Sequence, residues 1–223
     1  MLVSRENHTK SANRCVMIKD KSIQMFLDEL AGKASTPGGG SAAAVMGAMG
    51  AALLSMVANL TLGKKNYEGV EEDMKKLLQR TEELRGKLTD AIEADVKVFD
   101  KVMAAYGMPR DDEEAKTRRS SAIQIALKEA TDVPLECATH CAEVIRLSEP
   151  VAEMGNTNVI SDAGVAVLAA YAALRSAALN VYINIGGIRD EDFVEARRGQ
   201  LEETLEGMDK LTEEVYALVK SKL

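Results

Sequence analysis

The chain has 223 residues and a formal net charge of −7, with 46% hydrophobic and 28% charged residues. This length allows one large domain with a substantial core, and the composition argues against a disordered protein. The acidic balance disfavours nucleic acid or an acidic membrane as the partner, because phosphate groups reward clustered Lys and Arg. A small molecule is therefore the expected partner.

The first 21 residues are polar and lack helical periodicity. We expect a polar extension over residues 1–21 and one helical domain over residues 22–223. Nothing near the N-terminus resembles a cleavable apolar signal sequence, and three cysteines, Cys15, Cys137 and Cys141, cannot all pair with one another. These features predict a cytoplasmic protein.

Helix-spaced apolar residues occur in nearly every window, and strand signals are scarce. The predicted fold class is all-α, a helical bundle with long packed helices. A first helix follows Ser22, a candidate N-cap, and ends near Lys33. The loop STPGGG comes next, and Ser41 then opens a second helix that runs to about Leu62.

The stretch from Ser41 to Gly63 has no charged side chain and is long enough to cross a bilayer. Its Ala, Gly, Ser and Met content makes it too weakly apolar for insertion, so we reject a membrane span. Small residues recur every four positions at Ala43, Gly47 and Ala51 and allow neighbouring helices to approach closely. The pattern favours a buried central helix.

A seven-residue apolar repeat from Val70 to Tyr106 predicts a long helix packed lengthwise on others. One phase of the repeat holds Val70, Leu77, Leu84, Ala91 and Val98, and the other holds Met74, Thr81, Leu88, Asp95 and Val102. Asp95 is the misfit, because a carboxylate in an apolar seam must be paired, neutralised or exposed to a wet cavity.

The next helix is expected to start at a cap formed by Asp111 or Asp112 and to kink or break at Pro134. A further helix then runs from Leu135 to about Met154.

The polar turn GNTNVISD precedes a second nearly uncharged helix that ends near Ile185, with Ser161 as its expected N-cap and Asp162 in its first turn. A last amphipathic helix begins near Asp190 and continues to the C-terminus.

Four groups of residues could carry chemistry. The glycines Gly38, Gly39 and Gly40 with Ser41 leave backbone N–H groups open at a helix start, where an anionic or polar ligand group could bind; the alternative is a tight turn. The loop is not a Walker motif, because the GK[ST] ending is missing. Asp95 is the acid/base candidate, and its alternative is a buried structural carboxylate.

Lys64 could supply positive charge to a substrate, or it could be an ordinary solvated lysine. Asn156 and Asp162 in the polar turn, with Asn180 and Asn184 one turn apart on the following helix, could read the edges of a heterocycle. Helix capping and core hydrogen bonds are the equal alternative for these side chains.

A metal site receives little support. Cys137, His140 and Cys141 share one helical face but lack a fourth ligand, so we expect no metal. Ser/His/Asp catalysis is also disfavoured, because the second histidine, His8, lies in the polar leader.

Six segments together identify a resemblance: TPGGGSAAA, NLTLGKK, DAIEADVKVFD, ALKEATDVPL, GNTNVISD and NVYINI. From about Ser22 to the end, the chain resembles the cyclodeaminase/cyclohydrolase family of folate enzymes. That family includes the C-terminal domain of formiminotransferase-cyclodeaminase and stand-alone methenyltetrahydrofolate cyclohydrolases.

The resemblance implies an all-helical homodimer that binds a tetrahydrofolate derivative as substrate, without metal, nucleotide or another tightly bound cofactor. It implies that Asp95 is the proton donor. Lys64, Asn156, Asp162, Asn180 and Asn184 become candidate pocket residues together with the glycine loop.

Three functions remain open. The sequence shows no attached transferase domain, which favours methenyltetrahydrofolate cyclohydrolase over formimidoyltetrahydrofolate cyclodeaminase, although a separate transferase could supply the latter reaction. A non-catalytic folate-binding helical dimer is the third possibility.

Overall fold

The computed structural model describes residues 17–223, so Cys15 and most of the expected extension lie outside it. The described part contains helices and no strand, which confirms the all-α prediction. In chain order the elements are η1 (Ile18–Asp20), α1 (Ile23–Leu30), α2 (Gly39–Asn59), η2 (Glu68–Val70), α3 (Glu71–Tyr106), α4 (Glu113–Met154), η3 (Thr157–Val159), α5 (Ile160–Ile185), α6 (Glu191–Leu205) and α7 (Met208–Ser221).

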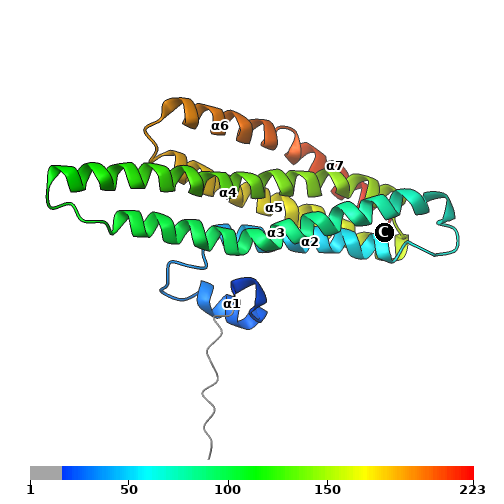
Figure 1. The fold of residues 1–223 in the computed structure, drawn as a ribbon. Coiled ribbons are helices and arrows are strands. Elements are labelled where there is room, and N and C mark those ends of the chain that lie inside the picture. The colour runs from blue at the N-terminus through cyan, green and yellow to red at the C-terminus, as the bar shows by residue number, and fades with distance from the viewer. Residues whose placement is uncertain (1–16) are drawn as a thin grey trace, which may run out of the picture.

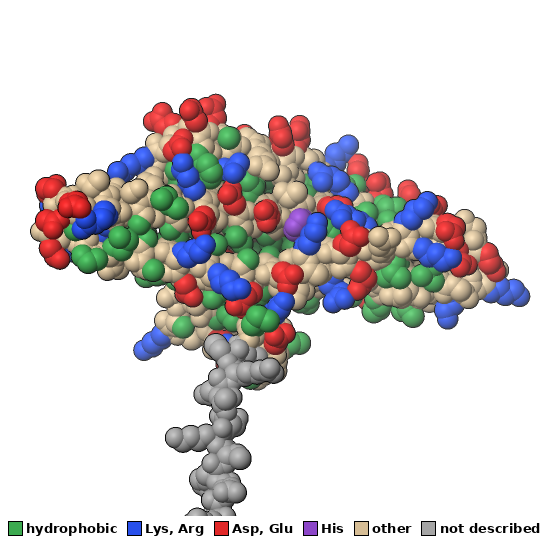
Figure 2. All heavy atoms as spheres, in the orientation of Figure 1, with side chains coloured by type: hydrophobic (Ala, Val, Ile, Leu, Met, Phe, Trp, Pro, Cys, Tyr) green, Lys and Arg blue, Asp and Glu red, His purple; other side chains and the backbone are tan. Residues whose placement is uncertain are grey.

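The long helices α2, α3, α4 and α5 form the body of the molecule (Figure 1). Helix α2 packs between α3 and α5, and α4 packs against α3 and α5. Helix α7 covers α5 and α4, and α6 lies on α4. Helix α1 stands apart below α3 in this view. The surface seen in this orientation carries interspersed acidic and basic side chains, without a large field of one sign (Figure 2).

Helices α2 and α5 are long and apolar enough to cross a membrane by length and composition alone, a test that core helices of soluble proteins also pass. About half of each apolar window is buried inside the bundle. The small residues of α2 explain the close packing there. An ideal Cβ placed on Gly47 would lie 2.7 Å from Sγ of Cys141 on α4, so only glycine fits without movement.

The apolar seam of α3 is confirmed. Met74, Thr81, Leu84 and Leu88 are fully buried against the core. Asp95 follows them on the same seam, one heptad after Leu88, and is half-buried. The carboxylate therefore occupies the position that the repeat reserves for a packed side chain.

The expected break at Pro134 is wrong, because α4 continues unbroken from Glu113 to Met154 through Pro134 and Pro150. A proline lacks the N–H that would bond the carbonyl four residues earlier. For Pro134 that carbonyl belongs to Ala130, and it accepts a hydrogen bond from the side-chain amide of Asn184 on α5, at 2.7 Å. A donor from another helix thus takes the place of the missing one.

Three other boundaries also differ from expectation. Helix α2 begins at Gly39 rather than at Ser41, so the last two glycines form its first turn. Ser161 lies inside α5, whose start has no side-chain cap, and the Asn156 side chain caps the preceding η3 by accepting from the N–H of Asn158. The single C-terminal helix is split into α6 and α7 at Gly207, whose φ of 73° is the left-handed conformation that glycine tolerates.

The N-terminal part of the described chain is anchored on α3. The N–H of Ile18 donates to a carboxylate oxygen of Glu93 at 3.2 Å, and Lys19 pairs with Asp90 at 2.6 Å. Ser22 caps α1, as predicted, by accepting from the N–H of Met25. The domain boundary expected at residue 21 stays a prediction.

Candidate functional site

Asp95 lies against the start of α2. The hydroxyl of Ser41 donates a hydrogen bond of 2.7 Å to Oδ2 of Asp95. An ideal Cβ on Gly40 would lie 2.0 Å from Oδ1 of the same carboxylate, so a larger residue at position 40 would collide with it. Because Gly40 has no side chain, the Asp95 carboxylate occupies the space that a Cβ would fill.

The pKa of Asp95 is raised above its ordinary value. Burial is the main cause, since it disfavours the charged form, and the hydroxyl and backbone N–H of Ser41 oppose it by bonding to the carboxylate. The group thus keeps a proton at higher pH than a solvated aspartate. A carboxyl in this setting is suited both to take up and to release a proton.

A small cavity of about 10 Å³ borders the carboxylate. It is about the size of one water molecule, too small for a heterocycle. The walls come from four helices and comprise Gly40, Ala44, Ala91, Asp95, Val133, Pro134, Cys137 and Ala177. Three of them, Ala91, Val133 and Cys137, also line an open groove of about 510 Å³ between α3 and α4.

Asn180 lies at the same end of the bundle. An ideal Cβ on Gly39 would be 3.8 Å from its amide, and its Nδ2 donates to the carbonyl of Ser176 on its own helix at 2.9 Å. Asn184, one turn further along, points its Nδ2 to α4 instead. The structure therefore brings the glycine loop, Ser41, Asp95 and Asn180 together, with Asn184 adjoining them.

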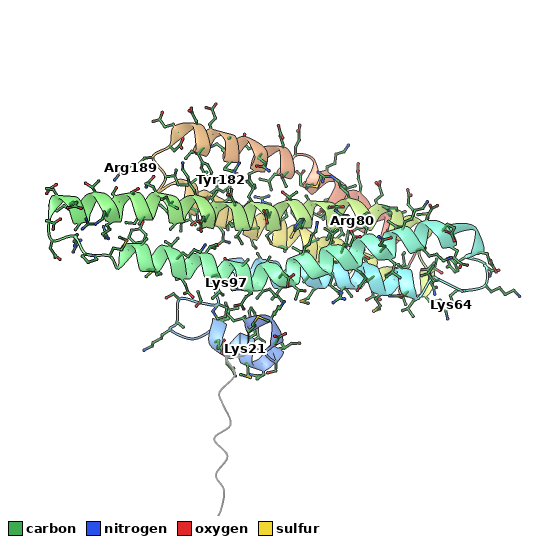
Figure 3. All side chains as sticks on the ribbon, in the orientation of Figure 1. Lys21, Lys64, Arg80, Lys97, Tyr182 and Arg189 are labelled. Atoms are coloured by element: carbon green, nitrogen blue, oxygen red, sulfur yellow. The ribbon has the colours of Figure 1, made fainter. Side chains whose placement is uncertain are left out.

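The remaining candidates lie at the opposite end. Asn156 donates from Nδ2 to the carbonyl of Leu60 at 2.8 Å, which places the polar turn beside the C-terminus of α2. Lys64 is exposed just beyond that terminus, and Asp162 is half-buried in the first turn of α5. Figure 3 shows Lys64 at the tip of the bundle, far from Lys97, which follows Asp95 by two residues on α3.

The two groups of candidates are separated by the length of α2. Its 21 residues span about 30 Å at about 1.5 Å per residue. Within one chain, Lys64, Asn156 and Asp162 therefore do not share a site with Asp95. The sequence motifs alone could not reveal this division, because each lies at one end or the other of two antiparallel helices.

Cys137, His140 and Cys141 diverge. Cys137 lines the cavity beside Asp95, Cys141 packs near Gly47, and His140 lines the outer groove between α3 and α4. Both described cysteines are free thiols. Within residues 17–223, no group of three His, Cys, Asp or Glu side chains is placed to hold a metal ion.

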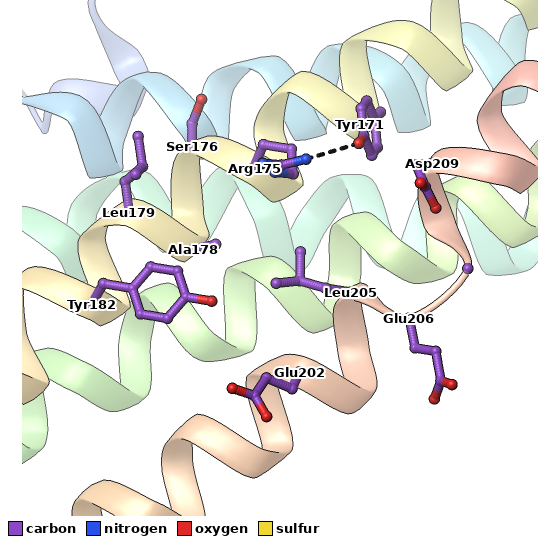
Figure 4. A pocket seen from close by; sticks show the side chains of 11 residues that line it. Tyr171, Arg175, Ser176, Ala178, Leu179, Tyr182, Glu202, Leu205, Glu206 and Asp209 are labelled. Atoms are coloured by element: carbon purple, nitrogen blue, oxygen red, sulfur yellow. Dashed lines mark hydrogen bonds between the residues drawn. The ribbon is translucent and has the colours of Figure 1, made fainter.

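A larger hollow of about 540 Å³ lies elsewhere, between α5 and the junction of α6 and α7 (Figure 4). Arg175 donates to the hydroxyl of Tyr171 on its wall, and Glu202, Glu206 and Asp209 also line it. None of the residues predicted for the site lines it. We therefore place the candidate site at Asp95, where the predicted residues contact one another, and not in this larger hollow.

Sequence reasoning missed Val133 and Pro134 as walls of the Asp95 cavity. A signal was present, because Pro134 falls inside a strongly helical pattern and inside the segment ALKEATDVPL. That signal alone indicated a break, because the donor that satisfies the Ala130 carbonyl belongs to Asn184, 54 residues away in the chain.

The family model described as formiminotransferase-cyclodeaminase matches residues 22–203. A methenyltetrahydrofolate cyclohydrolase from Methylorubrum extorquens is 58% identical over 207 residues, which is 93% of this chain and 100% of that protein.

Formimidoyltransferase-cyclodeaminase from Rattus norvegicus is 32% identical over 187 residues, and the match covers 84% of this chain but 35% of the rat protein. The crystal structure of formiminotetrahydrofolate cyclodeaminase from Thermotoga maritima superimposes with a TM-score of 0.78 at 36% identity. This match covers 92% of the present chain and 97% of that one.

Proposed function

The chain belongs to the formiminotransferase-cyclodeaminase family, and on this premise we propose that it is a methenyltetrahydrofolate cyclohydrolase in which Asp95 transfers the protons. The observation that carries the proposal is the match to the cyclohydrolase of Methylorubrum extorquens, because 58% identity extends over that whole protein. The formimidoyltransferase-cyclodeaminase of Rattus norvegicus matches at 32% identity over 35% of its own length.

The setting of Asp95 supports its role. In cyclohydrolysis, water attacks the methenyl carbon of 5,10-methenyltetrahydrofolate, and the tetrahedral adduct opens to 10-formyltetrahydrofolate as the bond to N5 breaks. The ionised Asp95 would accept a proton from the attacking water and pass it to N5 as that bond breaks. The adduct hydroxyl releases its proton as the formyl group forms. Burial and Ser41 together tune this carboxylate for both tasks.

Formimidoyltetrahydrofolate cyclodeaminase is the second candidate, favoured by the name of the Thermotoga maritima structure. There N10 would attack the formimino carbon and ammonia would leave, through a similar tetrahedral carbon. A non-catalytic folate-binding helical dimer is the third candidate, in which Asp95 would only hold the start of α2 through Ser41.

A homodimer is part of the proposal. Large apolar side chains are exposed along the outer faces of the antiparallel pair α2 and α5, with Met49 at 56%, Leu179 at 69% and Ile183 at 76% exposure. A patch of this kind on a soluble protein commonly marks a protein interface. Such a dimer would cover both helices.

The dimer would also unite the divided candidates. A two-fold axis perpendicular to α2 near its middle places the N-terminus of one α2 beside the C-terminus of the other. Gly38, Gly39, Gly40, Ser41, Asp95 and Asn180 of one subunit, with Asn184 adjoining them, would then form the substrate site with Lys64, Asn156 and Asp162 of its partner. The 10 Å³ cavity supports this arrangement, because the pterin must bind outside it.

We further propose that the protein acts in the cytoplasm on a free folate, without a tightly bound cofactor, nucleic acid or membrane as partner. The net charge of −7 supports the last two points.

Spectroscopy tests the proposed activity. Wild-type protein should accelerate the loss of methenyltetrahydrofolate absorbance well above the buffer rate. Ammonia release from formimidoyltetrahydrofolate without that loss would favour the cyclodeaminase. Saturable tetrahydrofolate binding without acceleration of either reaction would favour the folate-binding protein.

A further inference from the structure

We propose that Asn184 is a positioning residue for Asp95: its amide replaces the backbone donor that Pro134 lacks and thereby fixes the α4 wall of the cavity beside Asp95. The inference rests on the proposed function. It assigns one joint task to Pro134 in the segment ALKEATDVPL and Asn184 in the segment NVYINI, neither of which takes part in the catalytic step itself.

Pro134 leaves one backbone carbonyl of α4 without its usual N–H donor. Pro134 has no N–H, so the carbonyl of Ala130 loses its partner within α4. Ala130 is only 5% exposed, which leaves little access for solvent. A buried carbonyl without a donor is unfavourable, and proteins rarely leave one unpaired. The Nδ2 of Asn184 supplies the replacement donor at 2.7 Å.

The hydrogen bond from Asn184 to Ala130 lies next to the residues of α4 that line the cavity beside Asp95. Val133 and Pro134 line the cavity on the α4 side, and Ala177, two turns before Asn184, lines it on the α5 side. The hydrogen bond from Asn184 therefore joins two of the helices that supply walls of the cavity. Loss of the bond frees the Ala130–Pro134 turn to move, and water could then enter beside the carboxylate.

A separate link explains why the fold should survive that loss. Beyond Asn184, the side chain of Gln124 on α4 donates to the carbonyl of Gly187 at 2.9 Å and accepts from the N–H of Arg189 at 2.7 Å. The end of α5 is thus held to α4 independently. Asn184→Leu should disturb the cavity wall without releasing the helix.

A double-mutant cycle tests the proposal. Pro134→Ala restores a backbone N–H that can bond the Ala130 carbonyl, so it should make the Asn184 amide dispensable. In the wild-type background we expect Asn184→Leu to lower kcat about tenfold, within the range of coupled neighbours, with KM little changed. In the Pro134→Ala background the same substitution should lower kcat less than about twofold.

Two further measurements separate positioning from general stability. The kcat–pH profile of Asn184→Leu should move to lower pH, because water beside Asp95 weakens the desolvation that raises its pKa. Thr131→Val is the matched control. It removes a buried side-chain hydrogen bond to the carbonyl of Leu127 on the same turn, but that hydrogen bond does not replace a backbone donor lost to proline. Its effects should be the same in the wild-type and Pro134→Ala backgrounds.

Equal loss of kcat from Asn184→Leu in both backgrounds would overturn the proposal. If a variant is inactive, the melting temperature decides: a loss of stability that is the same in both backgrounds also overturns it. Coupled melting temperatures with uncoupled kcat would reduce Asn184 to a structural role and so contradict the positioning role. The activity of the wild type with methenyltetrahydrofolate is measured first, and its absence would instead refute the proposed function.

Discussion

The hydroxyl of Ser41 donates a 2.7 Å hydrogen bond to the carboxylate of Asp95, joining the first turn of α2 to the apolar seam of α3. Helix starts have unpaired N–H groups, and the Ser41 N–H also contributes to the setting of this carboxylate. Asp95 is thus both a partner for the start of α2 and a group with a raised pKa.

Removal of the Ser41 hydroxyl should move the pH dependence of catalysis. Ser41 lowers the pKa of Asp95 while burial raises it, so Ser41→Ala should raise that pKa further. The rise of kcat with pH, which reports ionised Asp95, is expected to shift to higher pH. Ser55→Ala is the control, because Ser55 lies on the same helix but bonds Thr81. A profile that shifts equally in both variants would contradict the prediction.

The raised pKa also predicts how stability depends on pH. The folded state binds the Asp95 proton more tightly than the unfolded chain, whose ordinary value is near 3.8. The stabilisation is therefore complete below that value and is lost as pH rises through the folded pKa. Urea unfolding should show the wild type losing stability relative to Asp95→Asn across this window. A relative gain with rising pH would mean that burial does not dominate.

Substitution of Gly40 should be costly. A Cβ at this position would meet Oδ1 of Asp95 at 2.0 Å, so Gly40→Ala must displace the carboxylate or the start of α2. We expect a loss of stability of about 1–3 kcal/mol and a larger fractional loss of kcat. Gly86→Ala on α3 is the control, since nothing lies within 4 Å of its Cβ, and it should be neutral or stabilising. Similar melting temperatures for both variants would contradict the prediction.

The proposed dimer predicts complementation between subunits. Asp95→Asn and Lys64→Ala affect opposite ends of one chain, and both variants should have low activity as homodimers. If each site uses both subunits, a mixed dimer contains one site that is intact, and mixing should restore about a quarter of wild-type activity at random assortment. Activity that stays at the level of the separate variants after verified subunit exchange would place the whole site within one chain.

The apolar periodicity predicted most of the helices and the misfit at Asp95, because these features are local. It did not predict the continuity of α4, since the donor that tolerates Pro134 is Asn184 on another helix. The apolar periodicity also could not show which polar candidates lie at which end of the helical bundle. Gly40 and Asn156 both looked like loop residues, and only the antiparallel packing of α2 and α5 separates them. Long-range pairing of this kind has no local sequence signature.

The central claim concerns proton transfer by Asp95, and Asp95→Asn tests it most directly. The amide keeps the size of the side chain and can still accept from Ser41, but it cannot take up the proton. With methenyltetrahydrofolate as substrate, the account predicts that kcat falls by about 10²–10⁴-fold in a folded dimer, while Asp100→Asn, an exposed change on the same helix, has little effect. Full turnover by correctly folded Asp95→Asn would contradict it.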